Sequence, residues 1–435
     1  MTRFHSYAGR VRHITHRQSV QVHPDLLSFL SNSFTQCSFI LPSLRSAQIS
    51  SSIHNAFQAS LSLSPELCHV QLDLGFKARD SSRLSDDILL HYLKQVIRFS
   101  PNLDTISIRG SATQCLNVAI SLLQNVKVLS LCLGSSLATD TLLAVTSFPC
   151  LLEFEVHAAH FDVEELGRLF LDRKASMFPS LQKLHVRAHS PVIELFLRAL
   201  PDDSLHSLHI EVEDPTGTTV SWITIFNLIC TKSANTLRKL TIEHNTELDG
   251  LDLEINNSTY PHPIADDKFN IHIPFTDLQV FEGLLHLRRF VLDTTLPVDI
   301  DDHKLELMLG WWPELEHLDL GSLPPVNPRA RQPLSSHSLV VIAKKSTKLI
   351  NLVLPVDISW AHNTPMVNLP RQPMLMRLTC GHPFPRTHTD VEVAKYLHWL
   401  FPSLRTLDGL SDQEDQWSRT QTVLRCLADH RYDEF

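Results

Sequence analysis

The hydrophobic residues of this chain recur in one short pattern. An apolar residue is followed by two other residues, a second apolar residue, one other residue and a third apolar residue, as in Leu181, Leu184 and Val186. The last two apolar positions alternate with polar ones, which is typical of a strand that buries one face. The clearest copies begin at Leu103, Val126, Leu151, Leu181, Leu205, Leu237, Leu287, Leu315, Leu349 and Leu375, and weaker copies begin at Val11, Leu44, Leu67 and Leu404.

Between these copies lie stretches whose apolar residues are spaced by three and four, the period of a helix with one buried face. We expect Ser85, Asp86 and Asp87 to begin one such helix, and Asp162 to cap another through its carboxylate. The expected helices run over residues 88–99, 166–170, 193–200, 222–229, 305–311, 339–343 and 391–400.

Each copy with its helix forms one unit of a repeat. The first positions run from Val11 to Leu404, so the fourteen units are about 30 residues apart, slightly longer than regular leucine-rich repeats. Several copies also carry a proline two residues before the first leucine, as Pro179 stands before Leu181. Proline ends the preceding helix and favours an extended chain after it.

Strand and helix alternate many times, which predicts parallel strands joined by helical crossovers. A doubly wound sheet or a barrel is the alternative, but a barrel ends at eight strands and both commonly use glycine-rich loops. This chain has only 12 glycines in 435 residues. We therefore predict an α/β leucine-rich-repeat solenoid, a horseshoe with parallel strands on the concave side and helices on the convex side.

The expected organisation is one array with a cap at each end, because the terminal units of a solenoid must cover an exposed core. Three long insertions interrupt the array, each directly after a strand and therefore on one rim. They are either part of a binding surface or variable exposed loops. The predicted segments are 1–20 (cap and first strand), 21–410 (array), the insertions 245–274, 321–334 and 355–373, and 411–435 (capping helix).

Composition narrows the classes of partner. The formal net charge is −9 and no long run of Lys and Arg occurs, so we expect no nucleic-acid partner. No stretch approaches eighteen apolar residues and residues 1–6 do not begin a secretory signal, so we expect no membrane association. The eight cysteines are scattered without a CxxC, and we expect reduced, mostly buried thiols in the cytoplasm or nucleus.

The sequence holds no motif with an attached catalytic mechanism: no P-loop, G-x-G-x-x-G, G-x-S-x-G or HExxH. His157 with His160, and Cys380 with His382 and His388, match no recognised zinc spacing. We interpret these histidines as solvent-facing or capping. Paired carboxylates such as 301–302 are interpreted as charges at helix N-termini rather than acid–base pairs. We therefore expect no enzyme, no catalytic residues, no cofactor and no metal.

In a solenoid of this kind, the residues that alternate with the buried strand positions point onto the concave sheet surface. This surface is mixed in charge and rich in His, Glu and Arg, which favours a polar protein as the partner. The predicted partner-binding residues are Arg109, Glu155, Lys183, His185, Arg187, His209, Glu211, Lys239, Glu243, Arg289 and His317.

The whole chain also resembles the leucine-rich-repeat region of fungal F-box proteins of the basidiomycete type. The resemblance rests on the segments 3–12, 300–315 and 393–405. It implies repeats that recognise the substrate of a cullin ubiquitin ligase, whose Skp-type adaptor would bind an F-box. No F-box stands before Arg3, so the adaptor is expected only where an F-box is present upstream. The alternative is a free-standing repeat scaffold or regulator with no link to ubiquitin.

Overall fold

The structure is a computed structural model in which the chain divides into two compact units, Met1–Ser204 (unit 1) and Leu205–Phe435 (unit 2). Each unit is described by itself. The residues that the structure describes are 6–16, 25, 39–50, 59–75, 83–172, 177–214, 220–244, 273–294, 298–321, 334–358, 369–381, 389–409 and 414–429.

Unit 1 contains strands that pair in chain order, each parallel to the next. The register is regular apart from a shift after Asp73 at the end of β3. Leu131, for example, lies beside Ile108 on one side and beside Val156 on the other. The strands are β1 (His13–Thr15), β2 (Ser46–Ser50), β3 (His69–Gly75), β4 (Thr105–Gly110), β5 (Val128–Cys132), β6 (Glu153–His157) and β7 (Lys183–Ala188).

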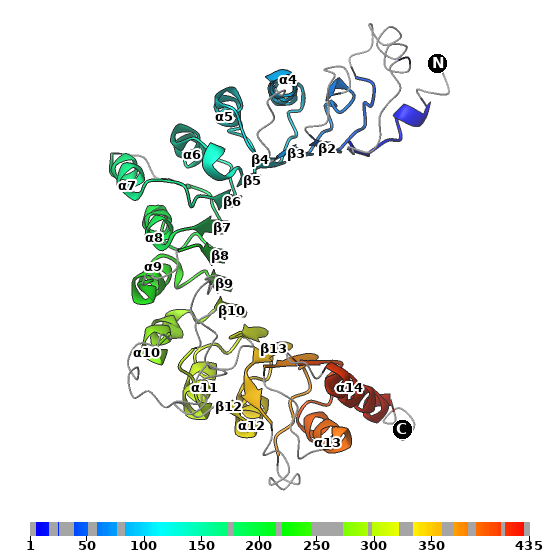
Figure 1. The fold of residues 1–435 in the computed structure, drawn as a ribbon, viewed down its shortest axis with the longest axis vertical. Coiled ribbons are helices and arrows are strands. Elements are labelled where there is room, and N and C mark those ends of the chain that lie inside the picture. Colours follow the sequence, from blue (N-terminus) through cyan, green and yellow to red (C-terminus); the bar gives the residue numbers. More distant parts are fainter. Residues whose placement is uncertain are drawn as a thin grey trace, which may run out of the picture. The chain divides into compact units, whose positions relative to one another are not determined.

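The helices of unit 1 lie on one side of its strand layer (Figure 1). Asp162 caps α7 by accepting a hydrogen bond from the Glu165 amide at 2.8 Å, as its sequence position predicts. The helical elements are α4 (Arg83–Phe99), α5 (Gln114–Ile120), η1 (Gly134–Ser136), α6 (Thr139–Val145), α7 (Val163–Leu171) and α8 (Ser190–Ala199).

Unit 2 repeats this arrangement, again with parallel neighbours in chain order. Its main strands are β8 (Ser207–Val212), β9 (Lys239–His244), β10 (Arg289–Thr294), β11 (His317–Asp319), β13 (Asn351–Leu354), β15 (Arg377–Cys380) and β16 (Thr406–Gly409). Its helical elements are α9 (Trp222–Ser233), α10 (Phe275–Leu278), η3 (Gln279–Gly283), α11 (Asp302–Leu309), α12 (Ser336–Lys345), α13 (Asp390–Leu400) and α14 (Glu414–Asp429).

These strands confirm the repeat, because each of the fourteen predicted copies coincides with one of them. The apolar positions of the pattern are buried, and Leu184, Leu208 and Leu240 are at most 2% exposed. A backbone ladder joins the turns before the strands. The amides of Gln182 and Lys183, for example, both donate to the Leu152 carbonyl of the previous unit. The fold class is thus the predicted α/β leucine-rich-repeat solenoid.

The spacing of the two layers explains why the strand side of each unit is concave. Neighbouring strands lie about 4.8 Å apart, whereas packed helices need about 8–10 Å. A stack of strand-and-helix units therefore bends toward its strands. We use "concave face" for the solvent-facing surface of the strands in each unit, opposite the helices.

Some sequence-based expectations need correction. Helix α4 begins at Arg83, so Ser85–Asp87 lie inside its first turns rather than before it. Helices α8, α9 and α12 are each longer than their apolar spacing predicts. The cysteines are not mostly buried: among the described ones only Cys380 is buried, since the others lie in turns, on helix surfaces or at partly exposed strand ends.

The segments predicted as insertions follow β9, β11 and β13 in the chain. Most of their residues, 245–272, 322–333 and 359–368, lie outside the described part of the chain. The ends of two of them form an additional parallel pair, β12 (Leu334–Ser335) with β14 (Val356–Asp357). The insertions at 321–334 and 355–373 therefore meet in a small second sheet, which the pattern of the repeat did not predict.

At the end of the chain, α14 packs against α13 and β16. Trp417 of α14 is buried directly over Gly409, where a Cβ would lie 2.0 Å from its indole nitrogen. Among the described residues, no helix has the length and the unbroken apolar character that crossing a bilayer requires.

Candidate functional site

The concave face carries all eleven residues that the sequence predicts to contact a partner. Each alternates along its strand with buried apolar residues, and none of the eleven side chains is itself buried. Five lie in unit 1 and six in unit 2. Their placement on this face is as predicted, whereas their role in binding stays a prediction. The unit 1 set is Arg109, Glu155, Lys183, His185 and Arg187, and the unit 2 set is His209, Glu211, Lys239, Glu243, Arg289 and His317.

In unit 1 the face is organised around Glu155 on β6. Its carboxylate lies 3.4 Å from Nδ1 of His185, the residue beside it in register on β7. The hydrogen bond from His185 and that from Ser130 lower the pKa of Glu155 to about 2, against the effect of its partial burial. Glu155 is therefore a carboxylate held in place by polar neighbours on both adjacent strands.

Two further members of the unit 1 set, Arg187 and Arg109, lie nearer the ends of their strands, at the next position that points to the same face. Arg187 lies beside His157 in register, and Arg109 lies beside Cys132. At the other end of the strands, the ammonium group of Lys183 contacts the Glu153 carboxylate at 2.5 Å. The face of unit 1 thus combines an ion pair where the strands begin with a histidine, thiol and arginine group where they end.

Unit 2 separates its charges along the strands. Where the strands begin, Lys239, Arg289 and His317 are successive neighbours in register. Where they end, Glu211, Glu243 and Asp293 are successive neighbours, and Asp319 of β11 lies beside Val291, two residues before Asp293 on β10. The described strands therefore form a basic row, Lys239, Arg289, His317 and, beyond Asn351, Arg377, and an acidic row, Glu211, Glu243 and Asp293, with Asp319 close to its end.

The acidic row shows the electrostatic cost of this arrangement. Burial raises the pKa of Asp319, and the carboxylates of Asp293 and Glu243 also raise it, against the lowering effects of the Gly321 amide and Arg289. His209 offsets part of the repulsion, with Nε2 lying 3.1 Å from Glu243 and 3.9 Å from Glu211. Like charges directly opposite on neighbouring strands destabilise a sheet. The row therefore stores repulsion that a cationic partner would relieve.

His317 occupies the basic row in an unusual state. Both ring nitrogens are buried without a hydrogen-bond partner in the described protein. Burial first, and the nearby Arg289 second, lower its pKa to about 4. His317 is thus neutral near pH 7, and the positive charge of the row comes from its lysine and arginines.

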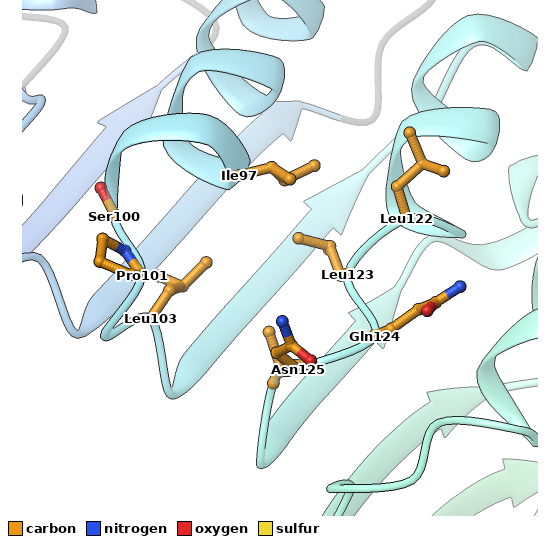
Figure 2. A pocket seen from close by; sticks show the side chains of 9 residues that line it. Ile97, Ser100, Pro101, Leu103, Leu122, Leu123, Gln124 and Asn125 are labelled. Atoms are coloured by element: carbon orange, nitrogen blue, oxygen red, sulfur yellow. The ribbon is translucent and has the colours of Figure 1, made fainter.

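One hollow on the surface of unit 1 is a poor site for a small molecule. It lies where β4 and β5 begin, and is lined by residues such as Ile97, Leu103, Leu122 and Asn125 (Figure 2). Its volume is about 60 Å³, far below the 300–1,000 Å³ typical of cofactor and ligand pockets. In the described part of the chain, the concave face is therefore a better candidate site than this hollow.

Cys132 is a member of the site that the sequence-based prediction missed. It follows Leu131 as Arg109 follows Ile108, so strand alternation would have placed it on the same face. Strand alternation also places His157 on this face, but its nearness to Cys132 and Glu155 appears only when neighbouring units are aligned. The Nε2 atom of His160 instead lies 2.9 Å from the carbonyl oxygen of Leu137. His382 and His388 lie outside the described residues.

Comparison with known proteins adds little to this geometry. No family model matches the chain, and the curated proteins include no significant match. A chain from the "Crystal structure of Rad7 and Elc1 complex in yeast" superposes with a TM-score of 0.39 and 13% sequence identity, over 90% of this chain and 83% of that one. So loose a superposition supports no argument about function, and the fold assignment rests on strand order and register.

Proposed function

We propose that this chain is a protein-binding repeat module whose concave face holds a polar segment of another protein. The observation that carries the proposal is the pair of charge rows in unit 2. A basic row runs across the starts of the strands and an acidic row across their ends, and the two rows overlap on β9 and β10. Opposed potentials of this kind steer a complementary protein surface and fix its orientation.

The predicted partner segment carries cationic side chains against the acidic row and anionic side chains against the basic row. Protein is a better match than nucleic acid, because a phosphate backbone would be repelled by Glu211, Glu243 and Asp293. A lipid surface is disfavoured by the same three carboxylates, since anionic membranes attract basic residues. No reaction chemistry is assigned to the face, and the proposed role is binding.

The finer assignment follows from the family resemblance described above. Repeats that hold the substrate of an F-box-type receptor need a face that reads another protein, and this face meets that requirement. A free-standing scaffold or regulator would use the same face, so the two assignments differ only in attachment to the ligase. The free thiols of the described cysteines are in keeping with a reducing compartment, cytoplasm or nucleus.

The decisive experiment reverses charge on the face and compares captured partners. A Glu211→Lys/Glu243→Lys variant is expected to lose the proteins that the intact chain captures from a lysate of its source cells. The matched control, Asp172→Lys/Glu282→Lys, changes net charge equally at exposed positions outside the strands. It is expected to capture the same proteins as the intact chain. Equal loss in both variants, or loss in neither, would refute binding through the acidic row.

A second measurement separates the two attachments. A version of the chain with its upstream sequence is mixed with the purified Skp-type adaptor of its source. Co-elution supports the receptor assignment, whereas no association, with partner capture intact, supports the free-standing scaffold.

A further inference from the structure

Three side chains on the concave face of unit 1 have the chemistry and spacing of metal ligands. Cys132 ends β5, and Glu155 and His157 lie on the adjacent strand β6 (Figure 1). The thiol sulfur, a carboxylate oxygen and a ring nitrogen all lie within 4.8 Å of one another. The sulfur and Oε1 of Glu155 are 3.8 Å apart. All three residues are partly exposed, so an ion can reach them from solvent.

These separations approach those of a tetrahedral zinc ion. Zinc binds sulfur at about 2.3 Å and nitrogen or oxygen at about 2.0–2.1 Å, so its ligand atoms lie roughly 3.3–3.6 Å from one another. The sulfur-to-oxygen distance of 3.8 Å is already close to this range. A separation at the 4.8 Å limit would have to shorten by roughly 1 Å, which small side-chain rotations on the partly exposed face can supply.

The surroundings also favour a bound divalent cation. A thiolate and a carboxylate together carry two negative charges, which match the charge of Zn²⁺. His185 contacts the Glu155 carboxylate at 3.4 Å and thereby fixes its direction, and groups that orient a ligand in this way raise metal affinity. Burial and the adjacent Glu155 carboxylate raise the pKa of the Cys132 thiol, so binding of the ion has to displace the thiol proton.

We propose that the thiolate of Cys132, the carboxylate of Glu155 and the ring of His157 bind one Zn²⁺ ion on the concave face. The protein supplies three ligands and the fourth position is filled from solvent or by a side chain of a bound partner. Three protein ligands with one exchangeable position are a known arrangement for zinc. The ligands come from neighbouring repeat units, which explains why no local spacing in the sequence announces them.

The first test titrates Co²⁺ and then Zn²⁺ into the whole chain after removal of metal with a chelator. Tetrahedral Co²⁺ with a thiolate ligand gives visible absorption bands and a near-ultraviolet sulfur-to-cobalt charge-transfer band, and Zn²⁺ abolishes both by displacement. We expect one equivalent of each ion to bind. Failure of the intact chain to bind a stoichiometric ion would overturn the proposal.

Variants locate the site. Cys132→Ser is expected to abolish the charge-transfer band, and His157→Gln to weaken Zn²⁺ binding by at least about 100-fold, because losing a ligand exceeds the cost of losing its orienting neighbour. His185→Gln is expected to weaken binding by about 10–100-fold while leaving the band in place. Circular dichroism checks that each variant remains folded.

Matched controls remove a thiol and an imidazole elsewhere. Cys150→Ser changes an exposed thiol in the turn before β6, and His69→Gln changes an exposed histidine on β3. Both are expected to bind metal as the intact chain does. A charge-transfer band that survives in Cys132→Ser, or disappears in Cys150→Ser, would place the metal elsewhere and refute the assignment. Because the titration uses the chain alone, its outcome is independent of whether the face binds a protein.

Discussion

Replacing Gln372 by methionine tests how strongly a single buried side chain holds neighbouring repeat units together. Gln372 is 1% exposed and satisfies all its hydrogen-bonding capacity with backbone. Its amide nitrogen donates to the carbonyls of Ser346 and Leu349 at 2.9 and 2.8 Å. Its amide oxygen accepts from the backbone amides of Met374 and Leu375 at 2.9 and 2.7 Å. One side chain thus connects the turn before β13 to the turn before β15.

The magnitude follows from those four bonds. Methionine has nearly the same size and fills the space, so little of the effect comes from a cavity. Each hydrogen bond contributes about 1 kcal/mol net, and an orphaned buried group costs about 1–3 kcal/mol. The Ser346 carbonyl keeps one weak partner, the Leu349 amide at 3.3 Å. We therefore expect Gln372→Met to lower the free energy of unfolding by about 3–5 kcal/mol.

The assay is urea unfolding followed by circular dichroism, with hydrogen exchange to localise the change. Amides near 346–349 and 374–375 are expected to exchange faster in Gln372→Met. The matched control is Gln182→Met, in the exposed part of the turn before β7, which is expected to change stability by less than about 0.5 kcal/mol. A Gln372→Met chain within about 1 kcal/mol of the original would refute the assignment of these bonds as the principal link.

Other substitutions test titration and close packing. His317 has its pKa lowered by burial to about 4, so protonation favours the unfolded chain and stability is lost as pH falls from about 6.5 to 4. The His317→Asn variant should therefore lose up to about 3 kcal/mol less stability on acidification than the original chain. The urea midpoints of both chains are measured at pH 7 and pH 4.5, and an equal decrease in the two chains would contradict this. Gly110 has φ +111° and a Cβ there would lie 2.6 Å from the Gly75 carbonyl oxygen, so Gly110→Ala should cost at least about 2 kcal/mol in urea unfolding. Gly409→Ala should displace Trp417, shift its fluorescence to longer wavelength and speed hydrogen exchange in α14; an unchanged spectrum would count against the observed packing.

The strands could be predicted from the sequence because their signal is strictly local. Leu184 and Val186 alternate with polar residues, and the same alternation returns in every unit. The helix boundaries were less predictable. Helix α4 starts at Arg83, although Ser85, Asp86 and Asp87 are residues typical of a helix N-terminus and therefore suggested a later start. The two-residue strands β12 and β14 are too short for any alternation to show.

The sequence predicts which residues lie on the concave face, but not which of them lie close together. Strand alternation placed Glu155 and His157 on the concave face, yet Cys132 lies 23 residues before Glu155 in the chain. Their proximity depends on the register between β5 and β6, which only the stacking of whole units determines. The role of Gln372 was hidden for a different reason. It stands in a proline-rich stretch that was interpreted as an insertion, although it is among the most buried polar residues described.

The even spacing of the parallel strands also gives the concave face of each unit a defined length across the strands. Seven parallel strands, spaced by about 4.8 Å, extend over roughly 29 Å. An extended peptide rising about 3.3 Å per residue would cross one unit in about nine residues, whereas a helix rising 1.5 Å per residue would need about nineteen. The length of the shortest competing peptide would therefore report which conformation the partner adopts when it is bound.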